Sequence, residues 1–230
     1  MTGPRTRPAR PALSREAVVA AALAVVDEVG FEAASMRRVA QALDTGAASL
    51  YVYVADRREL MALAHDLALA DVVVPTGADG DWRTRVELLI GRMIGALARH
   101  RDIAMAAIAD VPVGPHSLRL NEQVLALLRA GGVDEPTCAW AADLVGQFVA
   151  SSALEDAAWR QTQRIVGDPD ASPEAMSAAF SARLDAVYAA LPADEFPTIH
   201  ALRPWLTQGG GDARAAWKLR VLVDGLLARG

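Results

Sequence analysis

Residues 35–60 read SMRRVAQALDTGAASLYVYVADRREL, and this stretch decides the fold. Ser35 is a favourable N-cap, and the apolar spacing after it is helical up to Leu43. A turn of three residues at 44–46 contains a glycine, and a second short helix is expected over about 47–54. Two helices joined by such a turn are typical of a helix-turn-helix unit, whose second helix enters the DNA major groove.

The second helix of this unit is too short to be stable alone, so packing must hold it. Leu50, aided by Val54, is the expected inward anchor, which leaves small side chains and two tyrosines for the exposed side. An alanine can touch a thymine methyl group, a serine can hydrogen-bond to a base, and a tyrosine hydroxyl can donate to a phosphate. The alternative is that Tyr51 and Tyr53 only pack the head.

Two pairs of arginines lie at helix starts in this region. Arg37 and Arg38 fall in the first turn of one helix, and Arg57 and Arg58 open the next, which Asp56 would cap. Cations at a helix N-terminus oppose the helix dipole by ~0.3–1 kcal/mol each, whereas an incoming phosphate favours both the cations and the free N–H groups. We interpret Arg37 and Arg57 as phosphate ligands, with an ordinary charged face as the alternative. For Arg38 and Arg58 both interpretations stay open.

The rest of the chain shows helical apolar spacing without sustained alternation, which predicts an all-α fold. Proline and glycine punctuate 192–211, so that stretch is expected to be irregular. The helices are expected at about 15–29, 36–43, 47–54, 57–72, 82–99, 102–110, 117–130, 135–163, 173–190 and 212–229.

Composition favours a protein of the cytoplasm. The 230 residues are 53% apolar, enough for a sizeable core, and the single cysteine excludes an internal disulfide framework. The longest apolar run, 17–26, has ten residues and is too short to cross a bilayer. Net charge is −5, but residues 1–60 carry 8 arginines and 7 acidic residues, so a slightly basic head precedes an acidic body.

Residues 12–72 resemble the DNA-binding head of the tetracycline-repressor-like (TetR) transcriptional regulators, through the spacing of Gly30, Leu43, Leu50 and the segments 36–40 and 57–60. Tyr53 stands where relatives often carry His, and Asp44 where they usually carry Gly. The resemblance implies DNA contacts from Arg37, Ala47, Ala48, Ser49, Tyr51, Tyr53 and Arg57. The expected organisation is a disordered basic arm over 1–11, a three-helix DNA-binding domain over 12–72 with its motif at 35–54, and an effector-binding and dimerisation domain over 73–230.

The body is similar to the other half of the same family through HRDIAMAAIADVPVGP at 100–115, LNEQVLALLRAGG at 120–132 and WKLRVLVDGLLARG at 217–230. The helix expected at 135–163 has a bulky face, suited to a cavity or to plain core, and a small-sided face suited to a partner helix. Candidates for an effector pocket are Met93, Leu97, Met105, His116, Leu120, Trp140, Leu144, Gln147 and Phe148. Candidates for a dimer interface are Ala142, Val145, Val149, Ser152, Ala216, Leu219, Val223 and Leu226.

The sequence has no motif for a metal, a cofactor or a catalytic nucleophile. Its four histidines are scattered, and Ala107 stands where the family's tetracycline–magnesium binders place a metal-binding His. We therefore expect no enzyme but a ligand-responsive repressor that binds a palindromic DNA operator as a homodimer, does not enter the membrane, and is released by a small apolar effector. One alternative is an all-α small-molecule-binding protein or enzyme with an incidental helix-turn-helix; another is a general DNA-coating protein.

Overall fold

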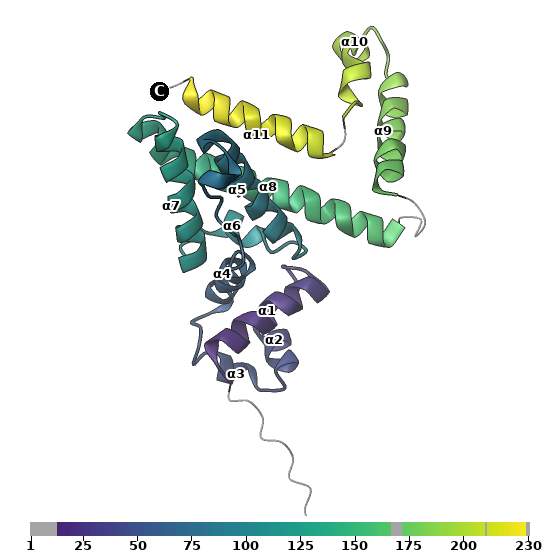
Figure 1. Cartoon of the computed structure of the whole chain (residues 1–230). Helices are drawn as coiled ribbons and strands as arrows, with labels where there is room; N and C mark the ends of the chain where they lie inside the picture. Colours follow the sequence, from purple (N-terminus) through teal and green to yellow (C-terminus); the bar gives the residue numbers. More distant parts are fainter. Residues whose placement is uncertain (1–12, 167–171, 210, 229–230) are drawn as a thin grey trace, which may run out of the picture.

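The computed structural model describes residues 13–166, 172–209 and 211–228. Every regular element in these ranges is a helix, which confirms the predicted all-α fold. Figure 1 shows a small group of helices at one end, next to a larger helical body. The basic arm predicted at 1–11 lies outside the described residues.

The head begins with the caps that the sequence predicts. The Ser14 hydroxyl accepts from the Ala17 amide at 3.1 Å, and the Asp56 carboxylate accepts from the Glu59 amide at 2.8 Å. The last two helices of the head are shorter than expected. The four helices are α1 (Arg15–Val29), α2 (Met36–Ala42), α3 (Ala47–Leu50) and α4 (Arg57–Ala68).

The head packs around side chains from all four helices. Val18 and Val26 of α1, Val39 of α2, Leu50 of α3 and Leu60 of α4 are completely buried. The predicted inward anchor of α3, Leu50, is therefore confirmed. Because α3 has only four residues, this buried anchor holds it against α2.

In its described residues, the body has one 3₁₀ turn and seven further helices. They are η1 (Gly77–Asp79), α5 (Trp82–Ala98), α6 (Met105–Ala109), α7 (Pro115–Ala130), α8 (Glu135–Val166), α9 (Pro173–Ala189), α10 (Pro197–Leu206) and α11 (Gly211–Leu227). The prediction that 192–211 is irregular was wrong, because α10 occupies half of it. Pro197 sits at the first helical position, where its missing N–H costs nothing, and Pro204 lies in the last turn.

The body core lies where α5 packs against α7 and α8. Leu89, Ile90 and Leu97 of α5 and Leu120 of α7 are at most 1% exposed. Helices α9 and α10 lie apart from this core and pack on each other, and none of their described side chains is buried (Figure 1). No helix in the described ranges is long and apolar enough to cross a membrane.

Polar contacts join the head to the body. The buried carboxylate of Asp66 on α4 accepts from the Ser117 amide and hydroxyl at the start of α7, both at 2.8 Å. A Cβ on Gly114 would come within 2.3 Å of Asp66, so this approach requires glycine. On the other side, Asp102 accepts from the Phe31 amide at 2.7 Å. The body thus contacts both α4 and the turn between α1 and α2.

Candidate nucleic-acid interface

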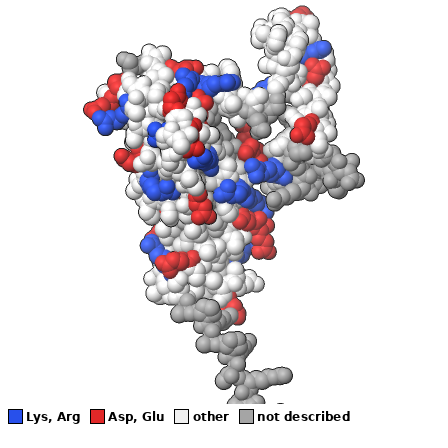
Figure 2. Space-filling view, viewed as in Figure 1, with Lys and Arg blue, Asp and Glu red and all other residues white. Residues whose placement is uncertain are grey.

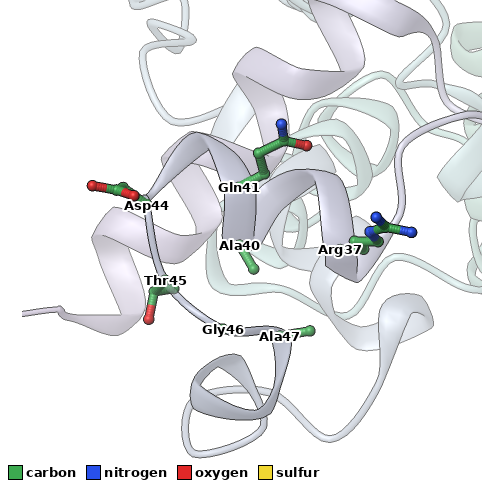
Figure 3. Close-up of a pocket in the computed structure, with 7 residues that line it drawn as sticks. All are labelled: Arg37, Ala40, Gln41, Asp44, Thr45, Gly46 and Ala47. Carbon is green, nitrogen blue, oxygen red and sulfur yellow. The ribbon is translucent and has the colours of Figure 1, made fainter.

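An open groove of about 520 Å³ lies between α2 and the start of α3. Figure 3 shows Arg37, Ala40 and Gln41 on α2, with the short side chains of Thr45 and Ala47 beyond the turn. A second groove of about 500 Å³ adjoins it and is lined by Ser35, Arg37, Arg38 and Gln41. Arg37 and Gln41 border both grooves because they are one helical turn apart on α2.

The arginines at the start of α2 are exposed and carry uncompensated charge. Within the described ranges, neither the Arg37 nor the Arg38 guanidinium makes a hydrogen bond or ion pair, and the first turn of α2 contains no acidic residue. Charged donors beside the free amides of a helix N-terminus form a site suited to phosphate. This arrangement supports the phosphate interpretation for this pair of arginines.

The arginines at the start of α4 are instead engaged within the protein. Arg57 donates through Nε to the Ala34 carbonyl at 2.6 Å and through a terminal nitrogen to the Phe31 carbonyl, and its guanidinium lies 4.9 Å from the centre of the Phe31 ring. Arg58 pairs with Asp110 at 2.8 Å, which raises the pKa of the arginine. A DNA contact by Arg57 stays a prediction, but its bonds already give it a role in positioning α4.

The predicted contact residues of α3 differ in exposure. Ala48 is exposed, Tyr51 is 55% exposed, and Ala47 and Ser49 are half-buried. The half-buried Tyr53 donates its hydroxyl to the Leu13 carbonyl at 2.7 Å. This bond supports the alternative considered in the sequence analysis, in which a tyrosine packs the head. Of the two tyrosines, Tyr51 is therefore better placed to bind a phosphate.

Gln41 and Thr45 line the groove but were missed by the sequence reasoning. The signal was present, because Gln41 follows Arg37 by four residues and so shares its face of the helix. Together, two uncompensated cations, a neutral amide and a helix with small side chains form a surface that can approach a duplex backbone and its base edges.

The predicted effector residues do not all come together. Met93, Leu97 and Leu120 are buried between α5 and α7, Met105 and Phe148 are partly buried against the same core, and His116 is half-buried with its amide bonded to Asp66. Trp140, Leu144 and Gln147 are exposed, and Trp140 is 82% exposed. This corrects the predicted pocket: the first part of the bulky face of α8 points away from the chain's own interior.

The reason lies on the opposite face of α8. Cys138, Ala141, Val145 and Val149 are small and buried, and they allow α8 to pack closely against α5. Small side chains predict close helix packing, but they do not say whether the neighbouring helix belongs to the same chain or to a partner.

The predicted dimer residues need the same correction. Val145, Val149, Leu219, Val223 and Leu226 are buried in the chain's own core, and Val223 has no exposed surface at all. A side chain without exposed surface cannot form a contact with a second copy. Of the remaining candidates, Ala142 and Ser152 are half-buried and Ala216 is exposed.

Charged groups of the body form no obvious reaction centre in the described part of the chain. No three His, Cys, Asp or Glu residues gather there as metal ligands would. Figure 2 shows basic and acidic side chains interspersed over the visible face of the body. In the head, burial lowers the pKa of His65 on α4 to about 4.

Two family models match the chain. Residues 18–64 match the bacterial regulatory proteins of the tetR family, and residues 74–229 match the tetracyclin repressor-like C-terminal domain. The HTH-type transcriptional repressor DrrR1 of Streptomyces coeruleorubidus is 32% identical over 172 residues, which are 74% of this chain. The matched segment spans 64% of the length of that relative.

Solved structures are similar over two thirds to nearly all of the chain. ActR of Streptomyces coelicolor in complex with actinorhodin is 34% identical, has a TM-score of 0.79, and is matched over 96% of this chain and 98% of its own. BioQ with its double-stranded DNA operator is 28% identical with a TM-score of 0.58, over 66% of this chain and 92% of that one.

Proposed function

This chain belongs to the tetR family of bacterial regulatory proteins, and we propose that it is a transcriptional repressor rather than an enzyme. In this proposal it acts in the cytoplasm, binds a palindromic DNA operator as a homodimer and is released by a small molecule. The observation that carries the DNA-binding role is the exposed, uncompensated pair Arg37 and Arg38 beside the open groove between α2 and α3. The operator complex of BioQ and the repressor DrrR1 support the same role.

The proposed domain division follows from these roles. The helix-turn-helix domain of residues 12–72 contacts DNA, and residues 73–230 bind the effector and form the dimer. Two heads related by a two-fold axis can read half-sites about 34–36 Å apart, or a multiple of that distance. A single head contacts too few base pairs to select one operator, so the function requires a dimer.

We place the dimer interface on the exposed apolar side chains of α8 and α11. Trp140 and Leu144 of α8 and Trp217 and Val221 of α11 are large, apolar and exposed in one chain, and Trp217 is 61% exposed. The two helices already pack on each other and are joined by the ion pair of Lys218 and Glu155 at 2.9 Å. A second copy would cover this apolar surface.

Glutamate at Trp217 tests this interface, because dimerisation would bury its charge without a partner. We expect Trp217→Glu to sediment as a monomer and to lose operator binding while its head remains folded. Trp205→Glu is the matched control, since Trp205 is equally large and exposed but lies on α10. A dimeric Trp217→Glu protein, or a monomeric Trp205→Glu protein, would move the interface away from α11.

We place the effector among the apolar side chains between α5, α7 and α8, where Met93, Leu97, Leu120 and Phe148 converge. The complex of ActR with actinorhodin supports a small-molecule effector. A coupling free energy of ~1–3 kcal/mol between the two sites would lower DNA affinity roughly 5- to 150-fold.

The deciding experiment selects duplexes from a random DNA library with the purified chain. Operator binding is then titrated with and without actinorhodin and (S)-DNPA, the compounds present in ActR structures. We expect a palindromic consensus and strongly salt-dependent binding. Enrichment of no sequence would exclude the repressor function. An operator whose binding responds to neither compound would exclude only these two effectors.

A further inference from the structure

Besides Arg37 and Arg38, helix α2 exposes one long neutral side chain, that of Gln41. Gln41 is exposed and borders both grooves, and its side-chain amide makes no hydrogen bond within the described residues. Its amide carries both donors and an acceptor. An exposed glutamine on a helix can be ordinary surface, so its position relative to α3 decides whether it has a further role.

Helix α3 is poor in side chains that can reach a base edge and hydrogen-bond there. Ala47 and Ala48 offer only methyl groups, and Ser49 is short and half-buried. The Tyr53 hydroxyl is bonded to the Leu13 carbonyl. A helix with such short side chains lies deep in the groove, which brings the neighbouring face of α2 closer to the DNA than a bulkier α3 would.

Gln41 lies on that neighbouring face. It lines the same groove as Thr45, Gly46 and Ala47 at the start of α3 (Figure 3). Ala40, beside it, points toward α3 and is too small to fill the space between the helices. Figure 3 shows the Gln41 amide directed away from Ala47, so a contact with a base pair requires rotation about its side-chain bonds, which an exposed glutamine can make.

We propose that Gln41 is a sequence-determining residue that reads an adenine in the major groove. This inference rests on the proposed DNA-binding function and adds a residue to it. A glutamine amide pairs with adenine through two hydrogen bonds, to N6 and N7. Arg37, one turn earlier, bears the charge that a phosphate contact needs, so the same face of α2 both positions the duplex and reads it.

The test compares binding-site selection by the wild-type chain and by Gln41→Ala, with every base pair of the selected operator then replaced in turn. Alanine is the best helix former, so the variant keeps α2. We expect a preference for one A·T pair in each half-site to disappear, and the wild-type operator to bind roughly 5- to 150-fold more weakly per half-site. The salt slope should not change, because glutamine releases no counterion.

Arg38→Ala is the matched control, since Arg38 shares the second groove with Gln41 but carries charge. It should flatten the salt slope and leave the base preferences intact. An unchanged base profile for Gln41→Ala, an equal weakening on all sequences, or a lost preference at a G·C pair would each overturn the proposal. A wild-type chain that selects no sequence would instead contradict the proposed function itself.

Discussion

The starts of α2 and α4 each carry two successive arginines, and the structure uses the two pairs differently. The guanidinium groups of Arg37 and Arg38 make no hydrogen bond or ion pair in the described part of the chain. Arg57 bonds to the carbonyls of Phe31 and Ala34, and Arg58 pairs with an acid of the body. Two arginines in the first turn of a helix are therefore available to an external ligand at α2 and are bonded within the protein at α4.

The difference shows what sets the role of a charged helix start. At α2 no carbonyl or carboxylate of the described residues bonds to either guanidinium group, so the charge is available to an external anion. At α4 the turn between α1 and α2 brings backbone carbonyls and the Phe31 ring to Arg57. Four substitutions can break or sharpen this comparison.

The largest effect is expected for Arg57→Ala, which removes two bonds from a charged donor and the contact with the Phe31 ring. Such bonds contribute about 1.5–3 kcal/mol each, so the free energy of unfolding should fall by about 3–6 kcal/mol. Chemical denaturation measures this loss. Arg37→Ala is the control and should change stability by less than about 0.5 kcal/mol. Equal losses in the two variants would remove the distinction between the pairs.

The sequence predicted the local features of this region and missed the distant ones. The caps at Ser14 and Asp56 and the inward Leu50 follow from residues a few positions away. The partners of Arg57 lie 23 and 26 residues before it, and Asp66 caps a helix 51 residues after it. Such pairings depend on the tertiary fold, so the sequence could not separate the two arginine pairs.

The predicted roles of the two faces of α8 were wrong for a related reason. Periodicity separated the bulky side from the small side correctly, yet the small side packs on α5 of the same chain. The same residue types are found in the core of a chain and in its interface with a partner, so the amino-acid pattern alone cannot distinguish these two environments. The exposed Trp140 and Trp217 become informative only when the fold is known.

The second effect concerns the pH dependence of α4. Burial lowers the pKa of His65 from 6.5 to about 4, so the unfolded chain takes up the proton first as pH falls. Above pH 6.5, His65 is neutral in both states and costs the fold no stability. As the pH falls from 6.5 to 4, the free energy of unfolding decreases, and the loss reaches about 3 kcal/mol at pH 4. Arginines do not titrate in this range, so this loss should persist in both arginine variants.

The measurement is the free energy of unfolding at pH values from about 7 to 4 for the wild type and for His65→Leu. Leucine is uncharged and of similar volume, so the variant should lose less stability in acid than the wild type. Carboxylates titrate equally in both proteins and cancel in the difference. Parallel pH profiles would show that His65 is protonated as easily in the folded protein as in the unfolded chain.

The third effect is on DNA, where Arg37→Ala should weaken binding more than it weakens the fold. A lost phosphate contact from a charged donor costs about 2 kcal/mol per head. The salt slope should become less steep by about 0.9 per contact, and so by about 1.8 for a dimer. Fluorescence anisotropy at several salt concentrations provides both values. A slope equal to that of the wild type would mean that Arg37 does not touch the phosphate backbone.

The smallest effect on stability is expected for Arg58, the residue that follows Arg57. Its pair with Asp110 is mostly exposed, and exposed pairs contribute little because water and salt screen them. Arg58→Ala should therefore melt within error of the wild type at about 500 mM salt and differ only slightly at about 20 mM.

A cycle with Arg58→Ala, Asp110→Ala and the double variant isolates the pair. Because Arg58 lowers the pKa of Asp110, the small coupling at low salt should be present at neutral pH and vanish as acid protonates the carboxylate. A large, salt-independent coupling would show that this joint between head and body is as firm as the one made by Arg57. The two adjacent arginines of α4 would then act as a single unit, and the contrast with α2 would extend to both.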